Sequence, residues 1–183
     1  MHCDLRVKQM TETINRNMSM VYRLAFSMVK TIQDAEDIRQ EVMLQYIRTN
    51  PTFTSREHEK AWFIRVTSNL CKNLWKTAWR QKTVSMGSLE ENGGEADSRK
   101  IIGNRKDNIG ISQEQEALTD EEERVIEAVK YLPMKYRVVI HLFYYEEMST
   151  EEIAEALRLK PSNVRARLTR ARKMLKKWLK EDV

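Results

Sequence analysis

The distribution of glycine and aromatic residues divides this 183-residue chain into two parts. All five glycines lie between residues 87 and 110, and no aromatic residue occurs between Trp79 and Tyr131. A polar, glycine-containing stretch buries too little apolar surface to offset the conformational entropy lost on folding. We therefore predict a first domain at residues 10–82, a flexible acidic linker at residues 83–119 and a second domain at residues 120–183.

Both predicted domains have apolar residues at helical spacing and lack the period-two alternation of strands. The expected fold class is therefore all-α, with two small helical domains. In the first domain we expect a helix over Asp34–Tyr46, with Asp34 as its N-cap. The expected core stripe of the next helix is Phe63, Val66, Leu70 and Leu74. That of the first helix in the second domain is Val125, Ile126, Val129 and Leu132.

Net charge is +5, and one segment near the C-terminal end is uniformly basic. The segment from Arg158 to Lys180 holds ten basic residues and no acidic one. Such a block indicates a polyanionic partner, either nucleic acid or an acidic membrane surface.

Several protein classes are disfavoured by composition. No apolar run has the roughly 18–20 residues needed to span a membrane, and no signal peptide opens the chain. Cys3 and Cys71 are too few for a disulfide framework, and no CxxC or HExxH spacing indicates a metal site. We expect a cytoplasmic protein without cofactor or bound metal.

The helix around Asp34–Tyr46 carries a second pattern besides its apolar stripe. Offsets of three, four and seven residues place side chains on one helical face. The residues that share this face are Asp37, Gln40, Glu41 and Leu44. A leucine among polar neighbours favours a protein-binding face, although an ordinary solvated face would show the same periodicity.

A long helix is expected over residues 60–80, and its outer band differs from a usual solvated face. The band combines cations, two amides and an indole, and it has no carboxylate: Trp62, Arg65, Asn69, Lys72, Asn73, Lys76 and Arg80. Cations attract phosphates, amides read base edges and an indole stacks on an unpaired base. The alternative is that Trp62 belongs to the core and the cations are simply solvated. Trp75 and Trp79 are expected to pack rather than to stack on bases.

The second domain ends in a predicted helix-turn-helix. Ser149 and Glu152 have the spacing of a capping box, and Pro161 suits the first position of the last helix. In this motif the first turns of the last helix reach base edges, and later cations meet phosphates. The base-reading candidates are Ser162, Asn163, Arg165 and Ala166. The remaining candidates on the exposed face are Arg167, Thr169, Arg170, Arg172 and Lys173.

With both domains considered, the sequence resembles bacterial sigma factors of the sigma-seventy family, in the extracytoplasmic-function group. Four segments in family-like order carry the resemblance: Asp34–Val42, Ala61–Asn69, Leu132–Arg137, and Ser149–Ala154 continued by Val164–Arg172. The family's turn often has glycine where Arg158 stands, and a capping serine where Lys160 stands.

The resemblance implies a role for each surface and excludes catalysis by the chain itself. The Asp37 face would dock on core RNA polymerase, and the Trp62–Arg80 helix would bind and open the minus-ten promoter element. The loop at residues 50–59 would capture a flipped base, and the helix-turn-helix would read the minus-thirty-five element. The implied partners are core RNA polymerase, promoter DNA and an anti-sigma factor.

Two other functions compete with this one. A dimeric helix-turn-helix regulator that binds operators would account for the second domain but would leave the first without a role. An enzyme acting on nucleic acid would need a P-loop, a metal-binding carboxylate pair or a Ser/His/Asp pattern, none of which the sequence has.

Overall fold

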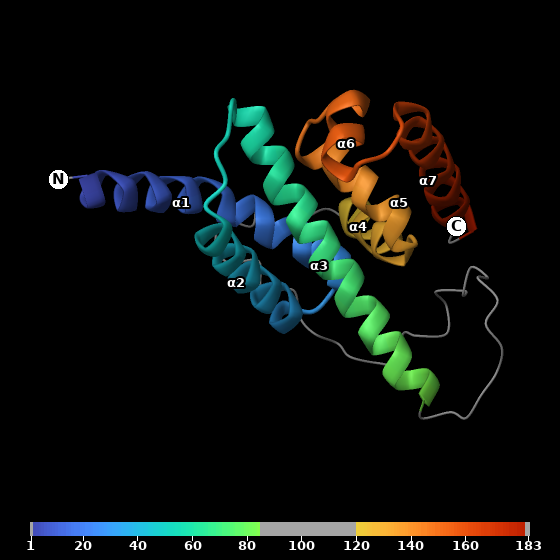
Figure 1. Cartoon of the computed structure of the whole chain (residues 1–183). Helices are drawn as coiled ribbons and strands as arrows, with labels where there is room; N and C mark the ends of the chain where they lie inside the picture. The colour runs from blue at the N-terminus through green and yellow to red at the C-terminus, as the bar shows by residue number, and fades with distance from the viewer. Residues whose placement is uncertain (1, 85–119, 182–183) are drawn as a thin grey trace.

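The computed structural model describes residues 2–84 and 120–181, with side-chain environments for residues 6–77 and 124–180. The helices are α1 (His2–Val29), α2 (Ile32–Thr49), α3 (Arg56–Val84), α4 (Asp120–Tyr131), α5 (Met134–Ile140), a π-helical turn (His141–Tyr145), α6 (Thr150–Leu157) and α7 (Pro161–Glu181). Within these ranges every regular element is a helix, which confirms the all-α class (Figure 1). The predicted linker lies outside the described residues except for Thr83 and Val84, which end α3.

The N-terminal half, α1 to α3, is built on apolar stripes at helical spacing. Val21, Leu24 and Ala25 of α1 are fully buried, as are Val42 of α2 and Phe63 of α3. Full burial of a leucine or phenylalanine side chain contributes about 2–3 kcal/mol relative to exposure. Packing of these stripes therefore positions the outer faces of α2 and α3.

Two helix starts in this half differ from the prediction. The N-cap of α2 is Thr31, whose hydroxyl accepts a hydrogen bond from the Asp34 amide at 3.1 Å. Asp34 instead lies in the first turn, where its carboxylate favours the positive end of the helix dipole. Helix α3 begins at Arg56 rather than near residue 60, because Ser55 Oγ accepts from the His58 amide at 3.1 Å.

Two of the predicted core stripes include residues that are exposed in the structure. Leu74 is 38% exposed, because the C-terminal part of α3 runs past α1 and α2 (Figure 1). Val125 and Ile126 are also exposed, because α4 lies at the edge of the molecule and packs mainly on α7. A helical stripe in the sequence therefore identifies the inward face without showing where its neighbours end.

The C-terminal half, α4 to α7, contains the predicted helix-turn-helix. The Ser149 hydroxyl accepts from the Glu152 amide, and the Glu152 carboxylate accepts from the Ser149 amide, so the capping box is confirmed. Pro161 is the first residue of α7, and Val164, Leu168 and Ala171 pack inward. Between α4 and α6 the chain forms α5 followed directly by the π-helical turn.

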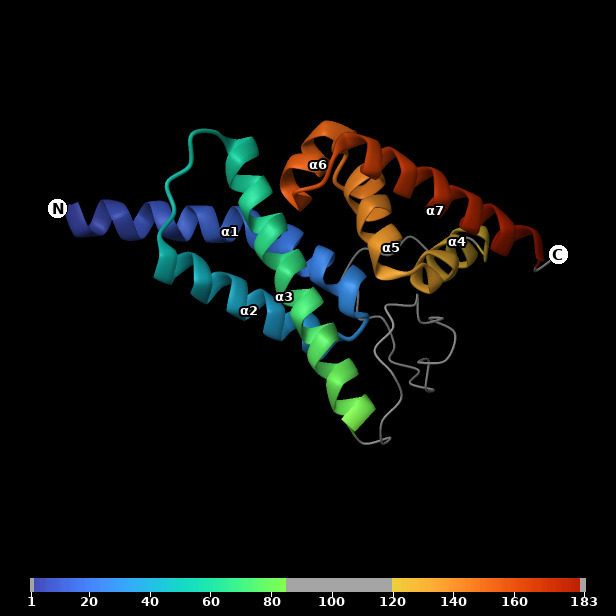
Figure 2. The same cartoon turned by 45° about the vertical axis from the view of Figure 1, so that its right-hand side comes forward.

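The two halves pack against each other to form one hydrophobic core. Helix α3 contacts α6, and α1 contacts both α5 and the π-helical turn. Figure 2 shows the same arrangement after rotation, with α6 beside the N-terminal part of α3. The two halves are therefore in direct contact across several elements.

Candidate nucleic-acid and protein interfaces

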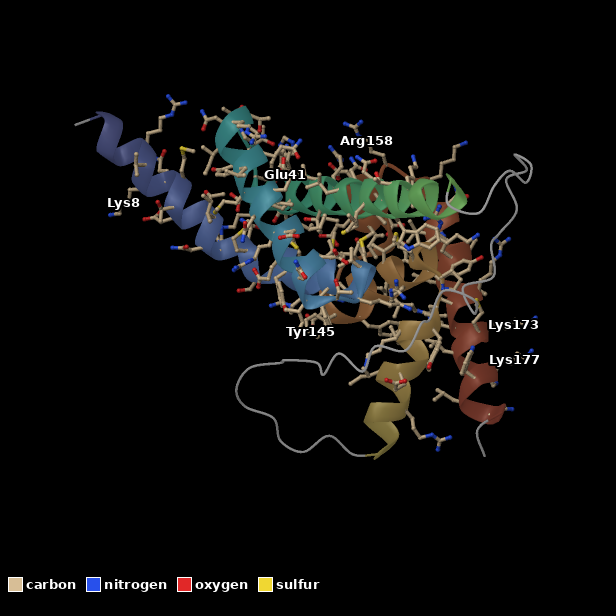
Figure 3. All side chains as sticks on the ribbon, turned by 90° about the horizontal axis from the view of Figure 1, so that it is seen from below. Lys8, Glu41, Tyr145, Arg158, Lys173 and Lys177 are labelled. Atoms are coloured by element: carbon tan, nitrogen blue, oxygen red, sulfur yellow. The ribbon has the colours of Figure 1, made fainter. Side chains whose placement is uncertain are left out.

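The outer face of α2 is open to solvent. Asp37 and Gln40 are exposed, Glu41 is half-buried and Leu44 is 41% exposed. Figure 3 shows Glu41 on this helix. Ile47, three residues beyond Leu44, is 44% exposed and extends the apolar part of the face. Its i,i+3 spacing was a usable signal that the sequence prediction overlooked.

The members of the predicted band on α3 differ in their exposure to solvent. Asn69, Lys72, Asn73 and Lys76 are exposed, whereas Trp62 and Arg65 are half-buried. The side chain of Arg80, like that of Trp79, lies outside the described environments. Trp75 is 45% exposed and adds an indole beside the exposed cations.

Trp62 belongs to an aromatic cluster between α2 and α3. Its ring lies edge-on to Phe63 at 5.0 Å and to Tyr46 at 5.9 Å between centroids, and it also contacts Phe53. Such edge-to-face pairs stabilise packing beyond the area they bury. Packing in this cluster therefore covers a large part of the Trp62 side chain, as the core interpretation expects.

Arg65 contacts the C-terminal half rather than solvent. Its guanidinium donates hydrogen bonds to the carbonyls of Glu155 at 3.0 Å and Ala156 at 3.3 Å, near the end of α6. Carbonyls in the last turn of a helix lack intrahelical partners and attract cations. In this arrangement the guanidinium is directed at protein and not at nucleic acid.

Cations of α3 and α7 approach each other. Burial, and next the nearby guanidinium of Arg167, lowers the pKa of Lys72. The positive charge of Arg167 on α7 therefore acts on the exposed part of the α3 band.

Helix α7 presents the predicted exposed face, apart from Arg167, which is half-buried. The exposed members are Ser162, Asn163, Arg165, Ala166, Thr169, Arg170, Arg172 and Lys173. Figure 3 shows Lys173 and Lys177 pointing away from the rest of the molecule.

Two arginines of this face have partners within the protein. Arg165 pairs with Glu151 of α6 at 3.1 Å, and both side chains are well exposed, so the pair is readily exchanged for a phosphate or base. Arg172 donates to the Tyr144 hydroxyl at 2.9 Å and lies over the rings of Phe143 and Tyr144. Arg172 is thus held against the π-helical turn.

The described residues give little support to a metal centre, a membrane span or a nucleophilic cysteine. No cluster of three or more His, Cys, Asp or Glu among them could hold a metal ion, and none of the described helices is long and apolar enough to cross a membrane. Burial raises the pKa of the Cys71 thiol to about 12, which makes it a poor nucleophile.

Comparison with known proteins assigns both halves. Residues 13–81 match the family model "Sigma-70 region 2", and residues 122–175 match "Sigma-70, region 4". The RNA polymerase sigma factor SigV of Bacillus subtilis is 31% identical over 163 residues, which cover 88% of this chain and 86% of SigV. The extracytoplasmic-function (ECF) factor SigW of the same organism is 27% identical over 88% of this chain and 83% of its own.

A solved structure has the same fold. The sigma factor RpoE from Bartonella quintana, in complex with the anti-sigma factor NepR, superposes with a TM-score of 0.71 at 20% identity, covering 96% of this chain and 99% of RpoE. The chain belongs to the sigma-70 family of RNA polymerase sigma factors, in the extracytoplasmic-function group. Sigma factors are initiation factors and not enzymes. The operator-binding alternative leaves the region 2 match unexplained and is discarded.

Proposed function

We propose that this chain binds core RNA polymerase through α2 and directs it to promoters through α3 and α7. The observation that carries the proposal is the separation of surfaces: an open acidic and apolar face on α2, and cationic faces without carboxylates on α3 and α7. The core-binding residues are Asp37, Gln40, Glu41 and Leu44, with Ile47 added to their apolar part.

The two DNA surfaces have different tasks. Exposed amides and cations from Asn69 to Lys76, with Arg65 and Arg80, bind the opened minus-ten strand, and Trp62 stabilises that end of α3. The first turns of α7 read base edges of the minus-thirty-five element, and the later cations contact phosphates. Arg165 is the strongest base-reading candidate, because its only described partner is the exposed Glu151.

Melting of the promoter depends on the polymerase. Opening four or five base-pair steps costs on the order of 6 kcal/mol. Stacking one or two extruded bases returns about 1–3 kcal/mol for each base. The isolated chain therefore binds DNA weakly, and strand opening is confined to the complex with core enzyme.

The site of action and the regulator follow from this role. Bacterial transcription takes place in the cytoplasm, so the chain works there. The relative RpoE is seen in complex with an anti-sigma factor, and a comparable inhibitor is a partner of this chain.

A pair of α2 variants tests the assignment of the core-binding face. Asp37→Ala should weaken binding to core polymerase, because it removes an exposed carboxylate from the face. Glu36→Ala is the matched control: it removes an acid from the same helix, but one whose carboxylate pairs with Arg39 beside the face. Equal affinities of the two variants for core enzyme, measured by fluorescence anisotropy, would refute the assignment.

A further inference from the structure

An aromatic pair lies beside the exposed face of α7 but outside the helix-turn-helix. Phe143 and Tyr144 both belong to the π-helical turn. Phe143 is half-buried and packs against the core, whereas Tyr144 is 58% exposed. The core therefore anchors the first ring, and the second ring adds to the surface that α7 presents to solvent.

This pair holds the side chain of Arg172 in three contacts. The Nε of Arg172 donates to the Tyr144 hydroxyl at 2.9 Å. The guanidinium carbon lies 5.4 Å from the centroid of the Phe143 ring and 5.6 Å from that of the Tyr144 ring. An aromatic face attracts a guanidinium without occupying its N–H donors. The rings thus restrict a long side chain that would otherwise lose much rotamer freedom on binding a ligand.

The hydrogen bond between Arg172 and Tyr144 leaves donors for an anion. Among the described contacts the two Nη groups of Arg172 bond to no acceptor. The Tyr144 oxygen accepts from Arg172, so its own proton remains available for donation. A hydroxyl that accepts from a cation is polarised and becomes a stronger donor. A positive guanidinium and a hydroxyl side by side match the oxygens of a phosphate group.

The position of Arg172 along α7 fits a phosphate of the DNA backbone. Arg172 lies ten residues after Ser162, or about 15 Å along the helix axis. The major groove is about 12 Å wide. If the first turn of α7 meets the base edges, Arg172 is carried to the edge of the groove, where the phosphates lie.

We propose that Tyr144 and Arg172 form a binding site for one backbone phosphate of the minus-thirty-five duplex. Phe143 and Tyr144 position the guanidinium, and the Tyr144 hydroxyl donates to the same phosphate. The inference rests on the proposed function of α7. A backbone contact carries no base preference, so this site fixes the register of the helix while Arg165 reads bases.

Removal of the hydroxyl tests the site in holoenzyme assembled from the full-length chain and core polymerase. The probe is a promoter fragment taken from a mapped transcript start. Tyr144→Phe keeps the ring and should weaken binding about fivefold, the effect of one hydrogen bond. Tyr145→Phe is the matched control, because it removes a hydroxyl from the neighbouring exposed tyrosine, whose ring stacks on His141. It should bind as wild type does.

A double-mutant cycle shows whether Tyr144 acts through Arg172. Arg172→Gln alone should also weaken binding, because it removes the charge from the site. The double variant should lose much less than the two single losses combined, since both residues serve one phosphate.

Replacement of single phosphates by neutral methylphosphonates locates the contact. Wild-type holoenzyme should lose about tenfold in affinity at one position, as expected for a hydrogen bond to a charged group. Arg172→Gln should not respond at that position, and Tyr144→Phe should respond less than wild type. A role of Tyr144 in stability alone would leave this profile unchanged.

Wild-type affinity of Tyr144→Phe would overturn the site. So would an equal loss from Tyr144→Phe with and without Arg172→Gln, or a methylphosphonate profile of Tyr144→Phe identical to that of wild type. Failure of the proposed function is separately visible, because wild-type protein would then give no protein-dependent starts. Normal starts from wild type with any of the three contrary results would overturn the phosphate site alone.

Discussion

Arg158 has a backbone conformation that is unfavourable for a residue with a β-carbon. It ends α6 with φ 54° and ψ 49°, in the left-handed region, where a β-carbon is unfavourable and glycine is not. The glycine that the family resemblance leads us to expect at this turn would adopt this conformation without that cost. Glu147, eleven residues earlier in the chain, also has a positive φ, of 53°.

Replacing Arg158 should stabilise the protein. Arg158→Gly is expected to raise the free energy of unfolding by about 0.5–1 kcal/mol, since the strain removed exceeds the entropy gained by the unfolded chain. Arg158→Ala is the control, because it removes the side chain and keeps the β-carbon. Urea unfolding that finds the glycine variant no more stable than the alanine variant would contradict this account.

His141 should make stability depend on pH. Burial lowers the pKa of His141 from 6.5 to about 4, against the opposing charge of Glu146. Between these two values the unfolded chain binds a proton that the folded chain does not, so stability falls as pH falls from about 6.5 to about 4. The loss amounts to roughly 3 kcal/mol over this window.

The contribution of His141 is isolated by substitution. His141→Phe keeps the ring that stacks on Tyr145 and removes the titration, so urea midpoints between pH 7 and pH 4.5 should change less than in wild type. His58→Gln, which alters an exposed imidazole, should keep the wild-type profile. The same pH dependence in His141→Phe as in wild type would refute the assignment.

At the scale of elements, features that depend on neighbouring residues could be predicted from sequence, and features that depend on tertiary contacts could not. The capping box at Ser149 was identified because both of its partners lie within one turn. The π-helical turn was not predicted, and Glu146 at its end contacts Arg23 and Lys60, which lie far away in sequence. Exposed faces on α2 and α7 follow from periodicity, whereas the contacts of Arg65 and Arg172 depend on packing that no periodicity encodes.

The capping box gives a prediction for α6. Ser149→Ala should lower the free energy of unfolding by about 1 kcal/mol, because the Glu152 amide loses its acceptor. Thr150→Ala is the neighbouring control, since its hydroxyl bonds only to the exposed Glu151 among the described contacts. Thermal unfolding with equal losses for the two variants would show that the cap is energetically unimportant.

Helix α7 gives a prediction for salt dependence. Lys173→Gln should weaken holoenzyme binding to all promoters alike, and should reduce the slope of log K against log salt by about 0.9, the value for one phosphate contact. Lys8→Gln removes an exposed cation from the projecting end of α1 (Figure 3) and should leave the slope unchanged. A wild-type slope in Lys173→Gln would place this lysine away from the DNA backbone.

At the scale of the whole molecule, the sequence indicated two helical parts but not their relation. The contacts that join the parts use carbonyl groups of Met28, Glu155 and Ala156, and backbone acceptors leave no trace in side-chain patterns. Those contacts also bear on residues assigned from sequence, because Arg65 bonds to the end of α6 in this structure and is proposed to contact DNA.

The most direct test of the central claim is to map transcript starts by sequencing after mixing the purified protein with sigma-free core polymerase and genomic fragments. The account predicts discrete starts that share two upstream elements, that require the added protein, and that are greatly reduced with Asp37→Ala but not with Glu36→Ala. No protein-dependent starts, with a core enzyme from the source organism that is active on nicked templates, would contradict it.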